Sequence, residues 1–291
     1  MKTPPEVEQF CQYLRVRNYS PHTVESYAID LRLFFAEAEE RVRKVTWRHV
    51  NRFVAHQHQQ GLAATTVNRR LNALKHFFDF LAVESASAPV NPVKPSHHVR
   101  TGRPLPKQLT RAQVRQLFAS ISNEMDRALF LLMLRCGLRV SEVARLTITD
   151  VDWEQGALIV RQGKGRKDRR VYLSSDAATG LKECLEGRPV KVPHNHLFWN
   201  QKRAGQPLSV KAMQKKMERY AKESEVKASC HSLRHTFASN LLEEGAEIVS
   251  IKEFLGHTSV ASSERYARLS NQKVKQTYLQ TMRKVISKTK V

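Results

Sequence analysis

Residues 136–142 read Cys136-Gly-Leu-Arg139-Val-Ser-Glu142, and they follow the apolar stretch Met125-Asp-Arg-Ala-Leu-Phe-Leu-Leu-Met-Leu. This pattern predicts a helix over 124–136, then a glycine turn that brings Arg139 to the start of another helix. An isolated arginine at a helix start is usually a surface cation. Its meaning therefore depends on the other polar clusters of the chain.

Four more such clusters follow in the sequence, and none is decisive alone. They are Gly163-Lys164-Gly165, His231-Ser-Leu-Arg234-His235, Leu255-Gly-His257 and Ser263-Glu-Arg-Tyr266. His231 and His235 stand four residues apart, which resembles half of a zinc site. However, no glutamate follows His231 and no carboxylate-rich partner lies nearby, so the sequence predicts no metal site. The order and spacing of the five clusters together carry the signal.

The elements around these clusters indicate a fold that is mostly α with a small antiparallel sheet. Thr110 is placed to cap a helix over 111–121. The apolar runs 158–160 and 171–173 flank the basic turn 163–168, which is typical of a β-hairpin. From residue 177 onward the pattern is helical again, interrupted by a loop over 187–207.

The stretch 84–108 holds several prolines and no apolar periodicity, which is typical of a linker. We therefore predict an N-terminal domain over 1–86, a linker over 87–108 and a larger domain over 109–291. Helical spacing of apolar residues predicts an all-helical N-terminal domain. Ser20-Pro21 marks one helix start, Thr46 can cap a third helix, and Thr65 or Thr66 a fourth.

The polar face of that fourth helix is a candidate DNA-binding surface. It carries amide, basic and imidazole side chains, which suit contacts to phosphates and base edges in a groove. A solvated helix face is the alternative interpretation. The residues on this face are Asn68, Arg69, Asn72, Lys75 and His76.

Composition limits the classes of protein to consider. The 291 residues, 41% of them hydrophobic, can form a sizeable core, while 49 Lys and Arg against 27 Asp and Glu give a net charge of +22. Residues 1–86 carry only +3 of this charge, so +19 lies in the remainder. A polyanion partner is indicated, and an ordinary metabolic enzyme is disfavoured.

There is no apolar run of roughly 18 residues for a membrane span, and the first residues lack the apolar stretch of a signal peptide. The four cysteines, which lie far apart, fit a reducing cytoplasm.

Taken in order, these clusters resemble the tyrosine site-specific recombinases, the Xer and phage-integrase superfamily, over nearly the whole chain. The stretches Tyr19-Ser-Pro-His-Thr-Val-Glu-Ser-Tyr27 and Arg70-Leu-Asn-Ala-Leu-Lys-His-Phe-Phe78 are similar to the core-binding domain of that family. The resemblance implies a four-helix core-binding domain followed by a larger, α-rich catalytic domain. It also implies a cytoplasmic, nucleoid-associated enzyme that joins DNA covalently to a tyrosine.

The resemblance assigns catalytic roles to Arg139, Lys164, His231, Arg234, His257 and Tyr266, with Glu142 and His235 in support. It makes the tyrosine the nucleophile that is joined to a 3′-phosphate, and the hairpin lysine the donor of a proton to the 5′-oxygen. Two permanently charged, planar guanidiniums can grip the phosphate oxygens, so neither a metal nor another cofactor is expected.

The family also implies partners: double-stranded DNA with paired inverted-repeat half-sites, and a tetramer of this chain alone or with a paralogue. Strands would be exchanged through a Holliday junction, for dimer or cointegrate resolution or for integration. A relaxing type IB topoisomerase and a catalytically silent DNA-binding regulator are the alternatives.

The tail over 270–291 carries six Lys or Arg and no acid. In relatives such a tail docks on a neighbouring protomer, whereas a solvated basic helix lying on DNA is the simpler interpretation.

Overall fold

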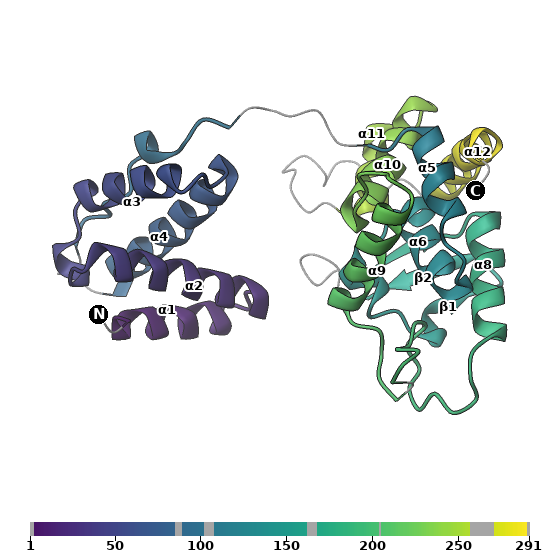
Figure 1. The fold of residues 1–291 in the computed structure, drawn as a ribbon, viewed down its shortest axis with the longest axis horizontal. Coiled ribbons are helices and arrows are strands. Elements are labelled where there is room, and N and C mark those ends of the chain that lie inside the picture. Colours follow the sequence, from purple (N-terminus) through teal and green to yellow (C-terminus); the bar gives the residue numbers. More distant parts are fainter. Residues whose placement is uncertain are drawn as a thin grey trace. The chain divides into compact units, whose positions relative to one another are not determined.

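The structure is a computed structural model that describes residues 3–84, 89–101, 108–161, 168–203, 205–256 and 271–289. The chain divides into two compact units, Met1–Pro104 and Leu105–Val291 (Figure 1). Each unit has a hydrophobic core of its own. We therefore describe each unit by itself.

The first unit is built from helices, as predicted. Its phenylalanines, among them Phe10, Phe34, Phe53 and Phe77, pack edge to face in the core, where aromatic rings contribute both area and favourable geometry. The elements are α1 (Pro5–Val16), α2 (Pro21–Ala38), the short 3-10 helix η1 (Val42–Lys44), α3 (Trp47–Gln59), α4 (Ala64–Glu84) and the 3-10 helix η2 (Pro95–His97).

Local signals mark two of these helix starts, those of α2 and α3. The Ser20 hydroxyl accepts a hydrogen bond from the Thr23 N–H at 3.1 Å, and Pro21 occupies the first helical position, which confirms the predicted start of α2. Thr46 precedes α3 as its N-cap residue. The prediction for α4 was wrong by two or three residues, because a cap at Thr65 or Thr66 would start the helix at 66 or 67, whereas it begins at Ala64.

The described part of the predicted linker, residues 89–101, packs onto the first unit. Val93 is buried in that unit's core, and Val99 packs against the core. The Asn68 side chain both donates to the Val99 carbonyl and accepts from the Val99 N–H, each at 2.8 Å. A proline-rich segment lacks some backbone N–H donors and does not form regular hydrogen-bonded structure by itself. The Asn68 side chain therefore provides the hydrogen-bond partners of the Val99 backbone.

The second unit surrounds one buried helix. Residues 124–136 form α6 as predicted, and α8 and α10 pack against it. The predicted hairpin is confirmed, since β2 pairs antiparallel with β3 in the register Ala157↔Tyr172 and Val160↔Arg169. The elements are α5 (Arg111–Ala119), α6 (Glu124–Cys136), α7 (Val140–Val143), the 3-10 helix η3 (Ile148–Asp150), β1 (Val151–Asp152), β2 (Ala157–Val160), β3 (Arg169–Tyr172), α8 (Ser175–Glu186), α9 (Val210–Glu223), α10 (Cys230–Glu243), α11 (Ile248–Leu255) and α12 (Asn271–Lys288).

The C-terminal helix α12 packs on its own unit (Figure 1, yellow). Tyr278, Met282 and Val285 are buried, and the Tyr278 hydroxyl donates to the Arg135 carbonyl at the end of α6, at 2.8 Å. The buried Arg135 guanidinium in turn donates to the Thr289 carbonyl at 3.0 Å. In this chain the tail is thus part of the folded core, and the interpretation as a solvated helix was wrong.

Two further observations concern the cysteines and the apolar character of the helices. All four cysteines are buried and form no disulfide. None of the described helices combines the length and the apolar character needed to cross a bilayer.

Candidate active site

Arg139 is brought into the site by a sharp turn. Helix α6 ends at Gly137, whose φ of +65° is left-handed. A Cβ at this position would lie 2.4 Å from the ring of Phe237, so glycine is required for space as well as for conformation. Arg139 is then the N-cap residue of α7, and the Glu142 carboxylate accepts its backbone N–H at 2.8 Å. The turn fixes where the Arg139 side chain begins.

Glu142 is the centre of the site. Its Oε1 accepts from Nη1 of Arg139 at 2.7 Å and from Nη1 of Arg169 at 2.9 Å. Its Oε2 accepts the Arg139 backbone N–H and Nη2 of Arg169, the latter at 2.9 Å. A carboxylate has about four lone-pair sites, and these four donors fill them. The side chain is only 1% exposed, so the group is held in one orientation.

Burial by itself raises the pKa of the Glu142 carboxyl, but its bonds to Arg169 and then to Arg139 outweigh burial and bring the pKa down to about 2. The group is therefore ionised throughout the neutral range. Three guanidiniums surround this single carboxylate, since Nη1 of Arg234 lies 3.7 Å from Oε2. The cluster keeps an excess of positive charge, which suits a phosphate ligand.

We expect Glu142→Gln to remove part of the acid sensitivity of folding. The folded pKa lies below the unfolded value of about 4.3, so the carboxylate stabilises the protein above that value and loses this contribution as pH falls toward 2. Between pH 7 and pH 3 the native chain should lose about 1–2 kcal/mol more unfolding free energy than the variant. Urea unfolding of the second unit at both values measures this, and equal losses would contradict it.

Arg234 comes from the second turn of α10 and is 6% exposed. Its Nη1 donates to the Gly137 carbonyl and its Nη2 to the Leu255 carbonyl, each at 2.5 Å. Burial, and then the nearby Arg139 charge, lower the Arg234 pKa to about 10, against the opposing effect of Glu142. The side chain is still a cation at neutral pH. Nη2 of Arg139 reaches the next carbonyl, that of Gly256, at 3.4 Å, so both predicted arginines meet at the end of α11.

His231 lies in the first turn of α10, and its ring packs edge to face on that of His235 with centroids 4.3 Å apart. Partial burial, then the charges of His235, Arg234 and Arg139, lower the His231 pKa from its usual value. The shift favours the neutral imidazole, which can accept as well as donate a proton. Among the described residues no three His, Cys, Asp or Glu side chains gather as metal ligands.

Three predicted catalytic residues, Lys164, His257 and Tyr266, lie outside the described residues. The structure places elements next to each of them in sequence: β3 begins at Arg169, α11 ends at Leu255, and α12 begins at Asn271. The five described residues of the predicted set lie together: Arg139, Glu142, His231, Arg234 and His235.

Sequence reasoning missed Arg169. It lies at the start of β3 and is 13% exposed, and both ends of its guanidinium bind Glu142. The available signal was weak: the stretch 166–170 holds four cations and Asp168, and nothing local marks one of the arginines as buried.

The candidate DNA-binding face of α4 is partly engaged within the first unit. Asn68 is bonded to Val99, as described above, and Nε2 of His98 lies 3.1 Å from the Asn72 amide oxygen. Both contacts come from the segment 89–101, which covers this part of the helix.

The remaining residues of that face have partners too. Arg69 forms a two-pronged ion pair with the buried Asp30, although its side chain is 47% exposed. Lys75 pairs with Asp79 at 3.3 Å, and both are exposed. The His76 ring stacks on that of Tyr27 with centroids 5.9 Å apart. Lys75 and Arg69 are thus the members with a cationic side chain open to a ligand.

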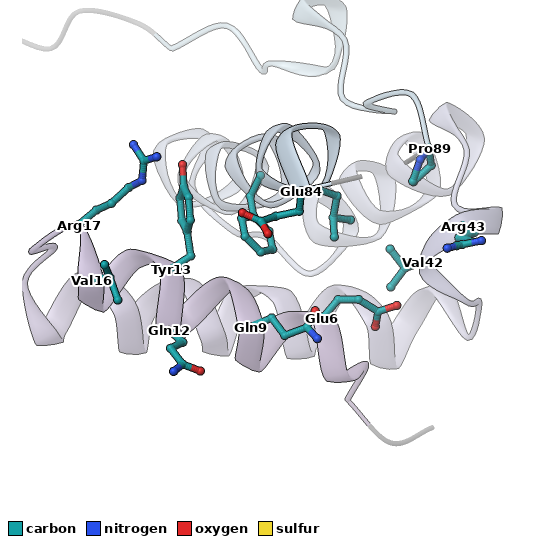
Figure 2. Close-up of a pocket in the computed structure, with 12 residues that line it drawn as sticks. Glu6, Gln9, Gln12, Tyr13, Val16, Arg17, Val42, Arg43, Glu84 and Pro89 are labelled. Atoms are coloured by element: carbon teal, nitrogen blue, oxygen red, sulfur yellow. The ribbon is translucent and has the colours of Figure 1, made fainter. Parts of the chain in front are cut away.

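A hollow of about 790 Å³ lies elsewhere, in the first unit. Figure 2 shows it lined by Tyr13 of α1 and by Arg17, the residue after that helix, together with Val42, Arg43 and Glu84. None of the predicted catalytic residues lines it. The arginine cluster therefore defines the candidate site by its chemistry, and this hollow does not.

Comparisons with known proteins cover both units. Residues 107–273 match the phage integrase family, and residues 7–85 match the phage integrase N-terminal SAM-like domain. The tyrosine recombinase XerA of Thermococcus kodakarensis is 33% identical over 273 residues, which span 93% of each chain.

Two solved structures extend the likeness in fold. The integrase of the Tn1549 transposon, in complex with circular intermediate DNA, aligns with a TM-score of 0.73 at 19% identity, over 93% of this chain and 98% of that one. A lambda integrase tetramer bound to a Holliday junction aligns with a TM-score of 0.71 at 18% identity, over 90% of this chain and 76% of that one. At these identities the likeness shows the fold, with a helical N-terminal domain and a mostly helical second domain with a small sheet.

Proposed function

Because the chain belongs to the phage integrase family of tyrosine recombinases, we propose that it exchanges strands between two DNA sites through a 3′-phosphotyrosyl intermediate and a Holliday junction. Site-specific recombination is the activity of the family. The observation that carries the finer proposal is the pair Arg139 and Arg234, which meet around one buried carboxylate in a cluster with excess positive charge. Such a pair suits a phosphodiester whose negative charge increases during cleavage.

In the proposed cleavage step the phenol oxygen of Tyr266 attacks the phosphorus, and the bond from phosphorus to the 5′-oxygen breaks. Arg139 and Arg234 stabilise the charge that builds up on the non-bridging oxygens. The 5′-oxygen leaves with a proton from Lys164, while the phenol proton passes to a histidine, His231 or His257. The lowered pKa of His231, which favours its neutral form, supports this role. His235, packed against His231, would orient it.

Rejoining is the reverse of this step, with the 5′-hydroxyl of the partner strand as nucleophile. The phosphotyrosyl bond retains the free energy of the cleaved ester, so no nucleotide is required. The two guanidiniums would take the place of a metal in stabilising the phosphate charge. The reaction proposed here therefore needs only residues of this chain and DNA.

The assembly we propose is a tetramer of this chain, alone or with a paralogue, on two DNA sites of paired inverted-repeat half-sites. Its support is the lambda integrase tetramer bound to a Holliday junction, which shares the fold. The +19 charge carried after residue 86 suits a duplex partner. The α4 face of Asn68, Arg69, Asn72, Lys75 and His76 would add contacts to the duplex. Nucleoid DNA of the cytoplasm is the proposed location, in keeping with four free cysteines.

A plasmid assay tests strand exchange against relaxation or binding alone. The site is first selected by repeated binding of the protein to a random duplex library, and one or two copies are then placed on a supercoiled plasmid. We expect deletion or inversion products only with two copies. Relaxation without recombinant products, at equal rates for one and two copies, would instead indicate a topoisomerase. Binding without any cleavage would indicate a silent regulator.

A further inference from the structure

Arg169 has no role in the reaction as set out above, yet it makes more contacts with Glu142 than Arg234 does. Its Nη1 and Nη2 donate to the two carboxylate oxygens, each at 2.9 Å, and its Nε donates to the Phe254 carbonyl at 3.1 Å. Three of its five N–H groups are thus used within the protein. The side chain is 13% exposed, so it is a poor candidate for direct contact with DNA.

The backbone beside Arg169 is shaped to receive it. Gly256, at a φ of +60°, lies so close that a Cβ there would be 3.1 Å from Nη1 and 3.2 Å from Cζ of Arg169. The Phe254 and Gly256 carbonyls accept from Arg169 and Arg139, respectively. The guanidinium is therefore clamped between the end of α11 and the Glu142 carboxylate.

The lone pairs of Glu142 show what this clamp achieves. Arg139 supplies two donors and Arg169 the other two, which leaves no site for a third arginine. Nη1 of Arg234 accordingly stays 3.7 Å from Oε2, beyond hydrogen-bond distance, and is aligned by backbone carbonyls instead. Without Arg169 the carboxylate would have two open lone-pair sites facing that cation.

We propose that Arg169 is a positioning residue that saturates Glu142 and so keeps the Arg234 guanidinium available to the scissile phosphate. This inference rests on the proposed function, because it gives a phosphate to Arg234. When Arg169 is removed, Arg234 moves onto Glu142, and the ion pair neutralises the charge that the transition state requires. Arg169 acts through Glu142 and touches no DNA.

A double-mutant cycle tests the coupling. The variants Arg169→Met, Glu142→Gln and the double variant are compared with the native chain in single-turnover cleavage of a nicked duplex. We expect Arg169→Met to lower the rate roughly 10- to 100-fold, by analogy with residues that orient the ligands of a catalytic metal ion. In the Glu142→Gln background the same change should have little effect, because the trapping charge is gone. Equal losses in both backgrounds would overturn the proposal.

A neutral substrate separates positioning from general damage to the fold. Replacing one non-bridging oxygen of the scissile phosphate by methyl removes the charge that Arg234 serves. The Arg169→Met loss should then shrink to within a few-fold, whereas a merely structural defect would persist unchanged. Arg169→Lys, which keeps one point charge near Glu142, should fall between native and Arg169→Met. It also serves as the test variant if methionine prevents folding.

The neighbouring residue provides a matched control. Arg170 also lies on β3, but it is 44% exposed and pairs with Asp152 at 3.7 Å. Arg170→Met should cleave at the native rate. If the native chain forms no covalent complex at all, the proposed function fails. If the native chain cleaves and Arg169→Met cleaves equally well, only the inference about Arg169 fails.

Discussion

We expect Tyr266→Phe to bind its DNA site with native affinity and to form no covalent complex with it. The substitution removes only the phenol oxygen, which is the proposed nucleophile, and leaves the aromatic ring. Affinity depends on the phosphate contacts of a strongly basic chain, and these do not involve that oxygen. Loss of a covalent nucleophile costs on the order of 10⁶-fold in a well-studied hydrolase, so cleavage should fall below detection.

The measurement uses a duplex nicked near the scissile phosphate, so that the cleaved fragment diffuses away and the complex accumulates. A denaturing gel then separates protein joined to DNA from free protein. Tyr13→Phe is the matched control, because it removes a phenol oxygen from the hollow in the first unit. It should form the complex at the native level. A covalent complex in Tyr266→Phe would mean that another side chain is the nucleophile.

Features with local physical causes could be predicted from the sequence. The start of α2 depends on Ser20 and Pro21, and the start of α5 on Thr110, whose hydroxyl accepts from the Gln113 N–H three residues later. The hairpin of β2 and β3 likewise follows from two apolar runs around a basic turn. In each case the interacting groups lie within a few residues, so that the sequence pattern contains the whole cause.

Features that depend on distant partners could not be predicted in this way. Arg169 and Glu142 are 27 residues apart, and nothing around residue 169 distinguishes this arginine from the exposed Arg170 beside it. Which of the two is buried depends on the end of α11, some 85 residues further on. Burial of a charge is set by where its partner lies in space.

The C-terminal tail shows the same limit in another form. The apolar stripe of α12 was visible in the sequence at residues 278, 282 and 285, but not the surface that receives it. That surface includes the Arg135 carbonyl of α6, which accepts a hydrogen bond from the Tyr278 hydroxyl. The sequence around Arg135 does not indicate that its backbone contacts a helix more than 130 residues away. An amphipathic pattern predicts that a face is covered without identifying what covers it.

Arg234→Lys should lose cleavage by roughly 10³-fold or more while still binding DNA, the range seen when an arginine that stabilises a phosphoryl transition state is removed. The native guanidinium donates to the Gly137 and Leu255 carbonyls in two directions and still presents N–H groups to a phosphate. A lysine ammonium is a point charge and cannot hold both carbonyls and two phosphate oxygens in a plane. Single-turnover cleavage of the nicked duplex measures the loss.

Two comparisons show that such a loss comes from the site itself. Arg219→Lys changes an arginine that is 55% exposed on α9, and it should cleave at the native rate. Arg234→Met should also unfold more easily, because it leaves two buried carbonyls without a donor, at about 1–3 kcal/mol for each unsatisfied group. The lysine variant keeps a cation beside Glu142 and should lose less stability than the methionine variant. Cleavage by Arg234→Lys within tenfold of native would contradict a planar, two-pronged contact, because a point charge would then suffice at this position.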